Sequence, residues 1–306
     1  MDDIRLYKNV DLVKPVMIAG WPGMGSVALG VVDYLQKKLK AIKFAEIAVD
    51  PLTTLDSVVV EDGLAALPPN TQNVFYYVRD PELIIFKGEA QLPGRDGIEL
   101  LKKVLDLAVK LKVSRVYTGA AFPFPISYKE VPQIYGAVNE KHLIDGITSF
   151  GAHPMDGGHI SGLNGLLLGF AKKKGIEAIC LLATMPQYAI SLPNPKASGA
   201  IIDMLERILR FKVDMKELDE HIRDMDEKMS MIEDKVKDVM VVEKAAPVLH
   251  NTEKKVPPYI MERIEKLFRE AASDKAKAIM LKKELDRWDL YKSYEDRFLD
   301  LFKNSQ

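Results

Sequence analysis

Short runs of apolar residues alternate with amphipathic segments along the first two thirds of the chain. The apolar runs predict strands at residues 16–19, 44–49, 74–78, 83–86, 113–118 and 179–183. The amphipathic segments predict helices at residues 27–39, 98–111, 163–174 and 197–211. Strands that are apolar at nearly every position are covered on both faces. The pattern therefore indicates an α/β fold with helices on both sides of one sheet.

The last third of the chain has a different pattern. Gly199 is the last glycine, and the three late prolines fall within residues 247–258. Residues 1–212 contain 46 charged residues, whereas the much shorter segment 213–306 contains 41. A highly charged segment without glycine favours helices over turns and sheets. We therefore predict an α/β core domain at residues 1–212 and a C-terminal helical arm at residues 213–306.

The arm opens with a coiled-coil-like segment at residues 214–240. Asp214 and Glu217 have the spacing of a capping box at the start of a helix. Apolar residues then follow at alternating intervals of three and four, which is a heptad pattern. The stripe consists of Met215, Leu218, Ile222, Met225, Met229, Ile232, Val236 and Val239. It predicts oligomer or partner contact through helix association, within or between chains, and in a parallel pair Lys228 would face Glu233 of the partner. The alternative is a single helix that lies on its own domain.

The remainder of the arm is predicted to be a linker followed by further helix. Residues 244–258 contain all the late prolines, and residues 259–303 contain neither glycine nor proline. A second apolar stripe follows the latter segment at helical spacing. We expect one long helix or several helices at 259–303, turned back on the first helix of the arm by the linker.

Composition excludes several classes of protein. The 306 residues include 43 Lys and Arg and 44 Asp and Glu, so the net charge is −1, which argues against a nucleic-acid binder. Cys180 is the single cysteine, so no intrachain disulfide and no multi-cysteine metal site can form. No apolar run is long enough to span a membrane. We expect a cytoplasmic protein without a cofactor.

The first glycine-rich loop follows the first predicted strand and contains Gly20, Gly23 and Gly25. Together with Ala28, the last two satisfy the dinucleotide-binding fingerprint, in which glycines let the backbone approach a pyrophosphate at a helix N-terminus. Glu46 and Asp50 lie near the sequence distance of a ribose-binding acid. Pro22, however, removes a backbone donor from the loop. The alternative is a tight turn that binds nothing.

The second glycine-rich loop contains Gly157, Gly158, Ser161, Gly162 and Asn164. Both loops lie where strands meet helices, so they could face one crevice, the usual ligand site of a layered α/β fold. This crevice supports the alternative function, an enzyme or a nucleotide- or nucleoside-binding protein.

Other interpretations of the second loop compete with that one. His153, Asp156 and His159 have donor types suited to a divalent metal, although no remote ligand can be named and we predict no metal site. Ser161 lacks the surroundings of a catalytic serine, and we expect it or the loop backbone to cap the following helix.

Several further residues have simple expected roles. Residues 122–126, Phe-Pro-Phe-Pro-Ile, are expected to form an irregular loop, either buried or used as a contact surface. His142, His221 and His250 are isolated in the sequence. Cys180 lies within an apolar run and is expected to be an inert core thiol.

Four motifs resemble those of the proteasome assembly chaperone family of the second type, including its archaeal and bacterial homologues. In order they are Gly-Trp-Pro-Gly-Met-Gly-Ser-Val at 20–27, Gly-Glu-Ala-Gln at 88–91, Gly-Leu-Asn-Gly-Leu-Leu-Leu-Gly at 162–169 and Leu-Pro-Asn-Pro-Lys-Ala-Ser at 192–198. The resemblance implies a three-layer α/β/α sandwich similar to nucleoside phosphorylases. It also implies a homo-oligomer that binds proteasome α-type subunits or the core particle without catalysis.

The sequence departs from this family at its end. Some archaeal members of the family end in a hydrophobic residue, then Tyr, then any residue, and this tail inserts into proteasome pockets. This chain ends Asn304-Ser305-Gln306. We therefore expect the protein to bind through another surface or together with a paired homologue.

Overall fold

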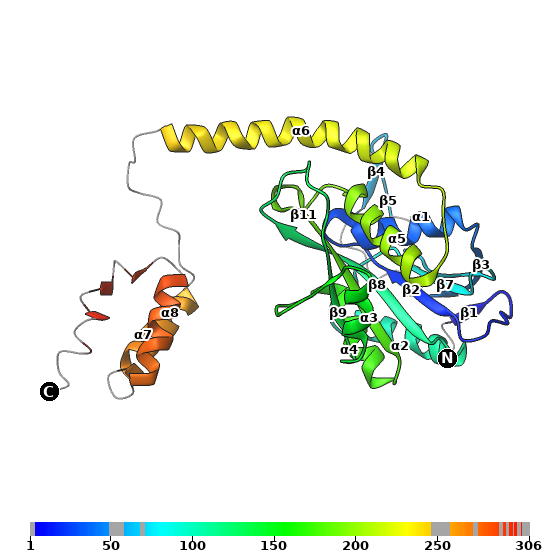
Figure 1. The fold of residues 1–306 in the computed structure, drawn as a ribbon, viewed down its shortest axis with the longest axis horizontal. Coiled ribbons are helices and arrows are strands. Elements are labelled where there is room, and N and C mark those ends of the chain that lie inside the picture. The colour runs from blue at the N-terminus through cyan, green and yellow to red at the C-terminus, as the bar shows by residue number, and fades with distance from the viewer. Residues whose placement is uncertain are drawn as a thin grey trace. The chain divides into compact units, whose positions relative to one another are not determined.

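The computed structural model describes residues 4–48, 58–67, 71–245, 258–271 and 275–287, together with 290, 291, 294, 295, 297, 298 and 301. These residues form two compact units, one within residues 1–239 and one within residues 240–306. The larger unit contains the sheet and most of the long helix that follows it (Figure 1).

A nine-stranded mixed sheet forms the centre of the first unit. Its strand order is β1-β3-β6-β7-β2-β8-β11-β9-β10. The four central strands, β7, β2, β8 and β11, pair with one another in parallel. On one side, β6, β3 and β1 extend the sheet by antiparallel pairing. On the other side, β9 pairs antiparallel with β11. The bounds are β1 Ile4–Leu6, β2 Val16–Gly20, β3 Ile42–Ile47, β6 Asn73–Val78, β7 Leu83–Gly88, β8 Arg115–Phe124, β9 Ile134–Val138, β10 His153–Pro154 and β11 Glu177–Pro186.

Helices cover both faces of this sheet. Side chains of α2 (Gly94–Lys110) and α4 (Gly162–Lys173) belong to one core cluster, and those of α1 (Val27–Lys38), α3 (Leu143–Ser149) and α5 (Pro195–Leu209) belong to the other. Strand β11 supplies both clusters, because Cys180 and Leu182 face one and Ile179 and Leu181 face the other. The predicted three-layer α/β/α sandwich is therefore confirmed.

The regular elements predicted from apolar patterning agree with the structure to within a few residues. The exception is the segment 122–126, because Phe122–Phe124 continues β8 and pairs with the end of β11. Proline is tolerated at Pro123 because strand ends can lose one ladder donor. The sequence did not predict β1, β9 and β10, nor a second sheet made of β4 (Val59–Glu61) and β5 (Leu64–Ala66). All except β9 are two or three residues long, and Gly136 interrupts the apolar run of β9.

Helix α6 (Lys216–Ala245) begins where the sequence predicts it. The Asp214 carboxylate accepts a hydrogen bond from the backbone N–H of Lys216, as an N-terminal cap does. Glu217 does not complete a capping box, because its carboxylate pairs with Lys37 and Lys38 of α1 at 2.8 Å each. The start of α6 is therefore attached to α1.

The apolar stripe of α6 faces its own unit over the part whose side chains are described. Leu218 and Met229 are buried, and Met215 and Ile222 pack on the cluster that contains α1 and α5. Met225 and Ile232 are half-buried, and the side chains of Val236 and Val239 lie outside the described residues. This arrangement matches the alternative of a single helix lying on its domain.

Polar contacts hold the same face of α6. Lys196 of α5 donates to Asp226 at 2.7 Å. Glu233 is buried and accepts hydrogen bonds from the Ser127 and Tyr188 hydroxyls, both at 2.8 Å. Glu233 is thus engaged within its own chain instead of facing Lys228 of a partner.

After α6, the described residues of the second unit form two helices, in line with the expectation of several helices at 259–303. Helix α7 (Pro258–Ala271) and helix α8 (Lys275–Arg287) share a small apolar cluster that includes Ile264, Phe268 and Leu281. Arg297 holds the Glu265 carboxylate by two hydrogen bonds, at 2.6 and 2.8 Å. Of the predicted linker at 244–258, residues 244 and 245 belong to α6 and Pro258 begins α7. Residues 246–257, which include His250, lie outside the described residues.

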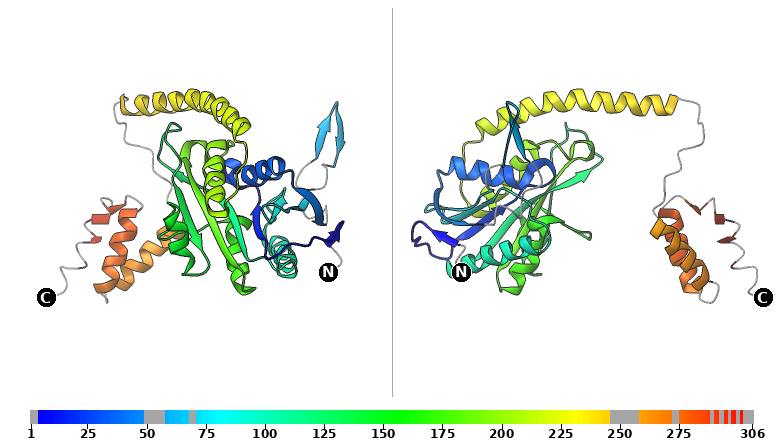
Figure 2. Two further views of the ribbon diagram at one scale, coloured as in Figure 1. Left: turned by 45° about the vertical axis from the view of Figure 1, so that its right-hand side comes forward. Right: turned by 180° about the vertical axis from the view of Figure 1, so that it is seen from behind.

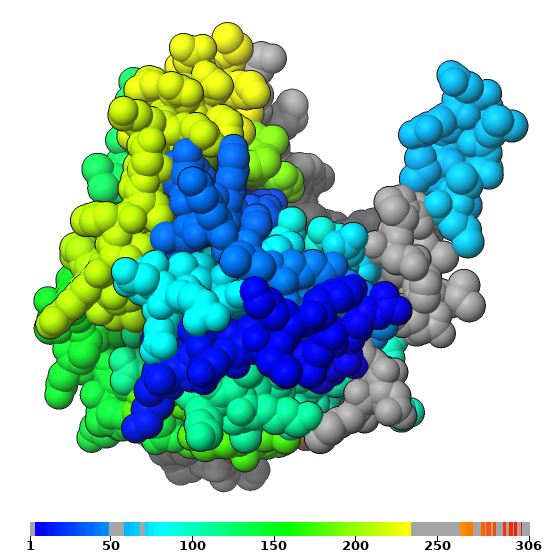
Figure 3. Space-filling view, turned by 90° about the vertical axis from the view of Figure 1, so that its right-hand side faces the viewer, coloured from blue at the N-terminus to red at the C-terminus, as the bar shows by residue number. Residues whose placement is uncertain are grey.

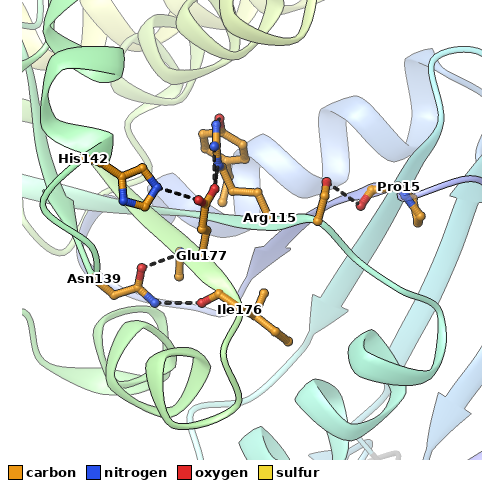
Figure 4. A network of polar contacts seen from close by, with 9 residues as sticks. Pro15, Arg115, Asn139, His142, Ile176 and Glu177 are labelled. Carbon is orange, nitrogen blue, oxygen red and sulfur yellow. Dashed lines mark hydrogen bonds and ion pairs between the residues drawn. The ribbon is translucent and has the colours of Figure 1, made fainter.

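A polar network joins the first residues of β8 and β11 (Figure 4). The Glu177 carboxylate accepts from Arg115 Nε at 2.8 Å and lies 2.6 Å from His142 Nε2, so His142 is not isolated in the structure. The Asn139 carboxamide donates to the carbonyl of Ile176 and accepts from the N–H of Ala178, both at 2.8 Å. This network closes the edge of the sheet at which the parallel strands start.

Replacing Glu233 tests the attachment of α6. In Glu233→Ala the hydroxyls of Ser127 and Tyr188 lose their acceptor in a partly buried site, so we expect the free energy of unfolding to fall by about 1–3 kcal/mol. Glu227→Ala, at an exposed position of the same helix, is the matched control and should change it by less than about 0.5 kcal/mol. Urea unfolding measures both. Equal effects of the two variants would contradict the described docking of α6.

The pKa of Glu217 tests the contact between α6 and α1. Hydrogen bonds from Lys37 and Lys38 lower the pKa of this carboxyl from 4.5 to about 2. A lowered carboxyl pKa stabilises the folded state above pH 4.5, and this stabilisation is lost as the pH falls from there towards about 2. Carboxyl NMR titration should show Glu217 titrating near the lower value, and Lys38→Met should raise it, whereas Lys40→Met should not. A wild-type Glu217 that titrates near 4.5 would disprove the contact.

Candidate functional site

A cavity of about 790 Å³ opens at the edge of the sheet where the parallel strands end. The loop after β2, the end of β8 and the start of α4 surround it. Of the predicted crevice residues, Gly23, Ser161, Gly162 and Asn164 line this cavity, and Gln91, from the loop after β7, lies between the two loops. The two glycine-rich loops therefore meet, as their positions after strands suggested.

The Asn164 carboxamide joins the two loops. Its Oδ1 accepts from the backbone N–H of Trp21 at 3.0 Å and from the Thr118 hydroxyl at 3.2 Å, and its Nδ2 donates to the Trp21 carbonyl at 3.1 Å. Asn164 is 5% exposed, so a change in this side chain cannot be compensated by water. One side chain of α4 thus binds the residue that follows β2 and Thr118 within β8.

Gln91 makes a second bridge between the loops. Its Nε2 donates to the Pro22 carbonyl at 2.5 Å and its Oε1 accepts from the N–H of Leu163 at 3.0 Å. The Gln91 carboxamide therefore satisfies the N-terminus of α4 in place of Ser161, which occupies the N-cap position without a side-chain hydrogen bond. Of the two expected caps, the Ser161 side chain and the loop backbone, the first is wrong. The bond to Leu163 shows that a distant amide has taken this role.

Glycine is required where the loops approach one another. A Cβ on Gly88 would lie 2.3 Å from the Trp21 ring, and a Cβ on Gly20 would lie 2.6 Å from the carbonyl oxygen of Ala28. Trp21 is completely buried and packs against Phe86, with ring centroids 4.9 Å apart. Gly20 and Gly88 therefore serve the packing of this joint and do not face the cavity.

The fourth motif closes the same loop from the other side. Gly25 donates its N–H to the Ile190 carbonyl at 2.8 Å, and its own carbonyl accepts from the N–H of Asn194 at 2.8 Å. Asn194 Oδ1 in turn caps α5 by accepting from the N–H of Ala197 at 2.9 Å. All four sequence motifs thus meet around the loop that follows β2.

The loop after β2 does not fit a dinucleotide pyrophosphate. The N–H groups of Gly25 and Ser26 are already bonded to the carbonyls of Ile190 and Gly23. Gly25 has φ +62° and faces Met185, whose sulfur would lie 2.8 Å from a Cβ at this position. Glu46 lies on β3, separated from β2 by β6 and β7, and pairs with Lys43 at 2.7 Å. Asp50 lies outside the described residues.

Of the remaining candidates, His159 lines the cavity, whereas Gly157 and Gly158 do not. His153 packs against Tyr135 with ring centroids 5.4 Å apart and the ring planes tilted by 43°. Within the described parts of the chain, no three His, Cys, Asp or Glu side chains gather as a metal site would require. Burial raises the pKa of the Cys180 thiol to about 12, so this expected core thiol is confirmed.

Two side chains that help to join the loops, Gln91 and Asn194, were not singled out from the sequence. Both are polar residues inside motifs that are otherwise glycine-rich or apolar. The available signal was a polar residue within such a motif, close to a predicted strand end. Its partners are distant in the sequence and could not be named from it.

Comparison with known proteins then assigns the family. A family model described as the PAC2 family matches residues 17–233, which include all four motifs. The chain belongs to the PAC2 family. The resemblance to the proteasome assembly chaperone family of the second type is thereby confirmed.

Solved structures similar to this PAC2-family chain share its first unit. PbaB of Pyrococcus furiosus, described as an archaeal proteasome activator, is 29% identical with a TM-score of 0.64, and the match covers 75% of this chain and 98% of PbaB. PbaA of the same organism, described as an archaeal homolog of proteasome-assembly chaperone, is 20% identical with a TM-score of 0.60, covering 78% of this chain and 99% of PbaA. The latter likeness concerns the fold alone.

A curated relative extends the match in sequence. An uncharacterized protein of Methanocaldococcus jannaschii is 26% identical over 247 residues, which cover 79% of this chain and 93% of the relative. In addition, no described helix of this PAC2-family chain has the length and apolarity to cross a membrane.

Substitution of Asn164 tests the joint between the loops. Asn164→Ala removes the partners of Trp21 and Thr118, so we expect the free energy of unfolding to fall by about 2–4 kcal/mol. Asn164→Asp should also destabilise the protein, because an oxygen would then face the Trp21 carbonyl. Denaturant unfolding provides the measurement.

Ser161→Ala is the matched control for Asn164. Because the Ser161 hydroxyl makes no cap bond, its loss should cost less than about 0.5 kcal/mol, compared with about 1 kcal/mol for a true N-cap serine. A cost as large as that of Asn164→Ala would show that the helix start is held differently from the described geometry.

Proposed function

We propose that this PAC2-family chain is a non-enzymatic proteasome assembly factor that works in the cytoplasm as a homo-oligomer. Its binding partners would be proteasome α-type subunits or the core particle, alone or together with a paired homologue. The observation that carries the proposal is the match to PbaB, an archaeal proteasome activator, over nearly the whole of that protein.

The use of the shared motifs supports a binding role over catalysis. The polar side chains of these motifs, Gln91, Asn164 and Asn194, form hydrogen bonds with the loops and helix starts of their own chain. Residues that a catalytic site would need to keep available for substrate are here part of the framework. These motifs hold the loops and helices of the α/β unit in fixed positions.

Co-purification tests this proposal. The full chain, immobilised through an affinity tag, should retain purified archaeal proteasome α-type subunits or the assembled core particle, because the proposed contact is with the α ring. Free β-type subunits are the matched control and should pass through. Mass spectrometry of the bound fraction identifies what is retained.

The same experiment can refute the proposal. Retention of neither α-type subunits nor core particle, by a chain that is folded by circular dichroism, would contradict it. Stabilisation by nucleosides, nucleotides or phosphate that grows with their concentration in a thermal-shift assay would favour the alternative use of the cavity.

A further inference from the structure

The hairpin formed by β4 and β5 is the most exposed apolar element of the first unit. Every residue from 58 to 67 is exposed, including Val60 at 61% and Leu64 at 77%. In Figures 2 and 3 the hairpin stands clear of the body of the unit. A two-stranded hairpin with both faces in water is marginally stable at best. This element therefore lacks a covering surface within the chain as described.

The cavity at the strand ends is lined mostly by apolar side chains, and no segment among the described residues fills it. None of its described lining residues is Asp, Glu, Lys or Arg. Its polar lining residues are Gln91, His159, Ser161 and Asn164, and its apolar walls include Met24, Phe122, Ile160 and Leu166. At about 790 Å³ it is large enough for several aliphatic side chains. Its occupant should therefore be apolar over most of its surface.

The charges of the hairpin and of the cavity rim are complementary. The hairpin carries two charged residues, Glu61 and Asp62, next to each other at its turn. The rim contains Gly94 and Gly162, the first residues of α2 and α4, and a helix N-terminus carries partial positive charge. An acidic tip between apolar sides therefore fits this cavity better than a basic or uniformly polar segment would.

We propose that the β4–β5 hairpin of one copy inserts into the cavity of a second copy. Val60, Leu64 and Leu67 would contact the apolar walls, and Glu61 and Asp62 would lie beside the starts of α2 and α4. A second copy is favoured as the occupant because the hairpin follows β3 and precedes β6, on the side of the sheet away from β8, and extends from the body there. Since hairpin and cavity are different surfaces, the contact repeats head to tail and can close into a ring.

The inference rests on the self-association part of the proposed function and not on the identity of the client. It assigns the faces through which copies meet. In this arrangement α6 keeps its place on its own unit, with Leu218 and Met229 buried as described.

Disulfide trapping between copies tests the contact directly. Leu64→Cys and Leu166→Cys are introduced into separate full-length chains, which are purified, mixed and oxidised. Cys180 is fully buried and does not compete. We expect a covalent dimer in the mixture, seen on a non-reducing gel and containing both variants by mass spectrometry. Absence of this dimer overturns the proposal. So does a doubly substituted chain that forms only an intrachain disulfide, because the hairpin would then cover its own cavity.

Charge substitution with light scattering provides the second measurement. Val60→Glu with Leu64→Glu should reduce the subunit count to one without changing the melting temperature of the monomer, because both positions are exposed. Leu166→Glu, at a half-exposed position of the cavity wall, should do the same. Val131→Glu, at an 84% exposed position outside both surfaces, is the matched control and should leave the count unchanged.

The outcomes separate this inference from the proposed function. A wild-type monomer, or an oligomer that keeps its subunit count in the hairpin variant, overturns the inference. In the second case the proposed function stands if α-type subunits are still retained. A trapped dimer together with no retention of α-type subunits supports the inference and contradicts the proteasome partner.

Discussion

The first unit depends on one buried carboxamide. Asn164 binds the backbone of Trp21 through both its oxygen and its nitrogen while accepting from Thr118. The first turn of α4 is therefore fixed to the end of β2 and to the neighbouring parallel strand β8. Parallel strands that end side by side leave a crevice between their following loops. Here that crevice is given rigid walls by side chain-to-backbone bonds, and Gln91 and Asn194 extend the same principle to the loops on either side.

Helix α6 shows how an apolar stripe can be used within a chain. The heptad spacing is present, but it indicates only that one face of the helix must be covered. The pattern does not say by what. The deciding contacts are polar and distant in sequence, namely Glu217 with α1, Asp226 with Lys196, and Glu233 with Ser127 and Tyr188. Glu233, which a parallel coiled coil would place opposite Lys228 of another chain, is therefore engaged within its own chain.

The parts of this fold that sequence reasoning could predict are those governed by local patterns. Apolar runs located β2, β7 and β11, and helical periodicity located α2 and α5, because burial acts on each residue along an element. The edge strands and the pairing order were not predictable, since β1 and β9 have no distinctive run and antiparallel or parallel pairing depends on connections across the sheet. At the site, glycine positions after strands were sufficient to predict that two loops meet. The hydrogen bond between Gln91 and the start of α4 could not be predicted, because Gln91 and Leu163 lie 72 positions apart in the chain.

Strand β11 packs against both helical layers with alternate residues. Its even-numbered positions from Ala178 to Leu182 pack against one helical layer and its odd-numbered positions against the other. Inserting or deleting one residue near its start would exchange these two sets along the remainder of the strand and place each layer against side chains shaped for the opposite one. Length variation within the family should therefore be tolerated in surface connections such as the one carrying β4 and β5, and eliminated from this strand.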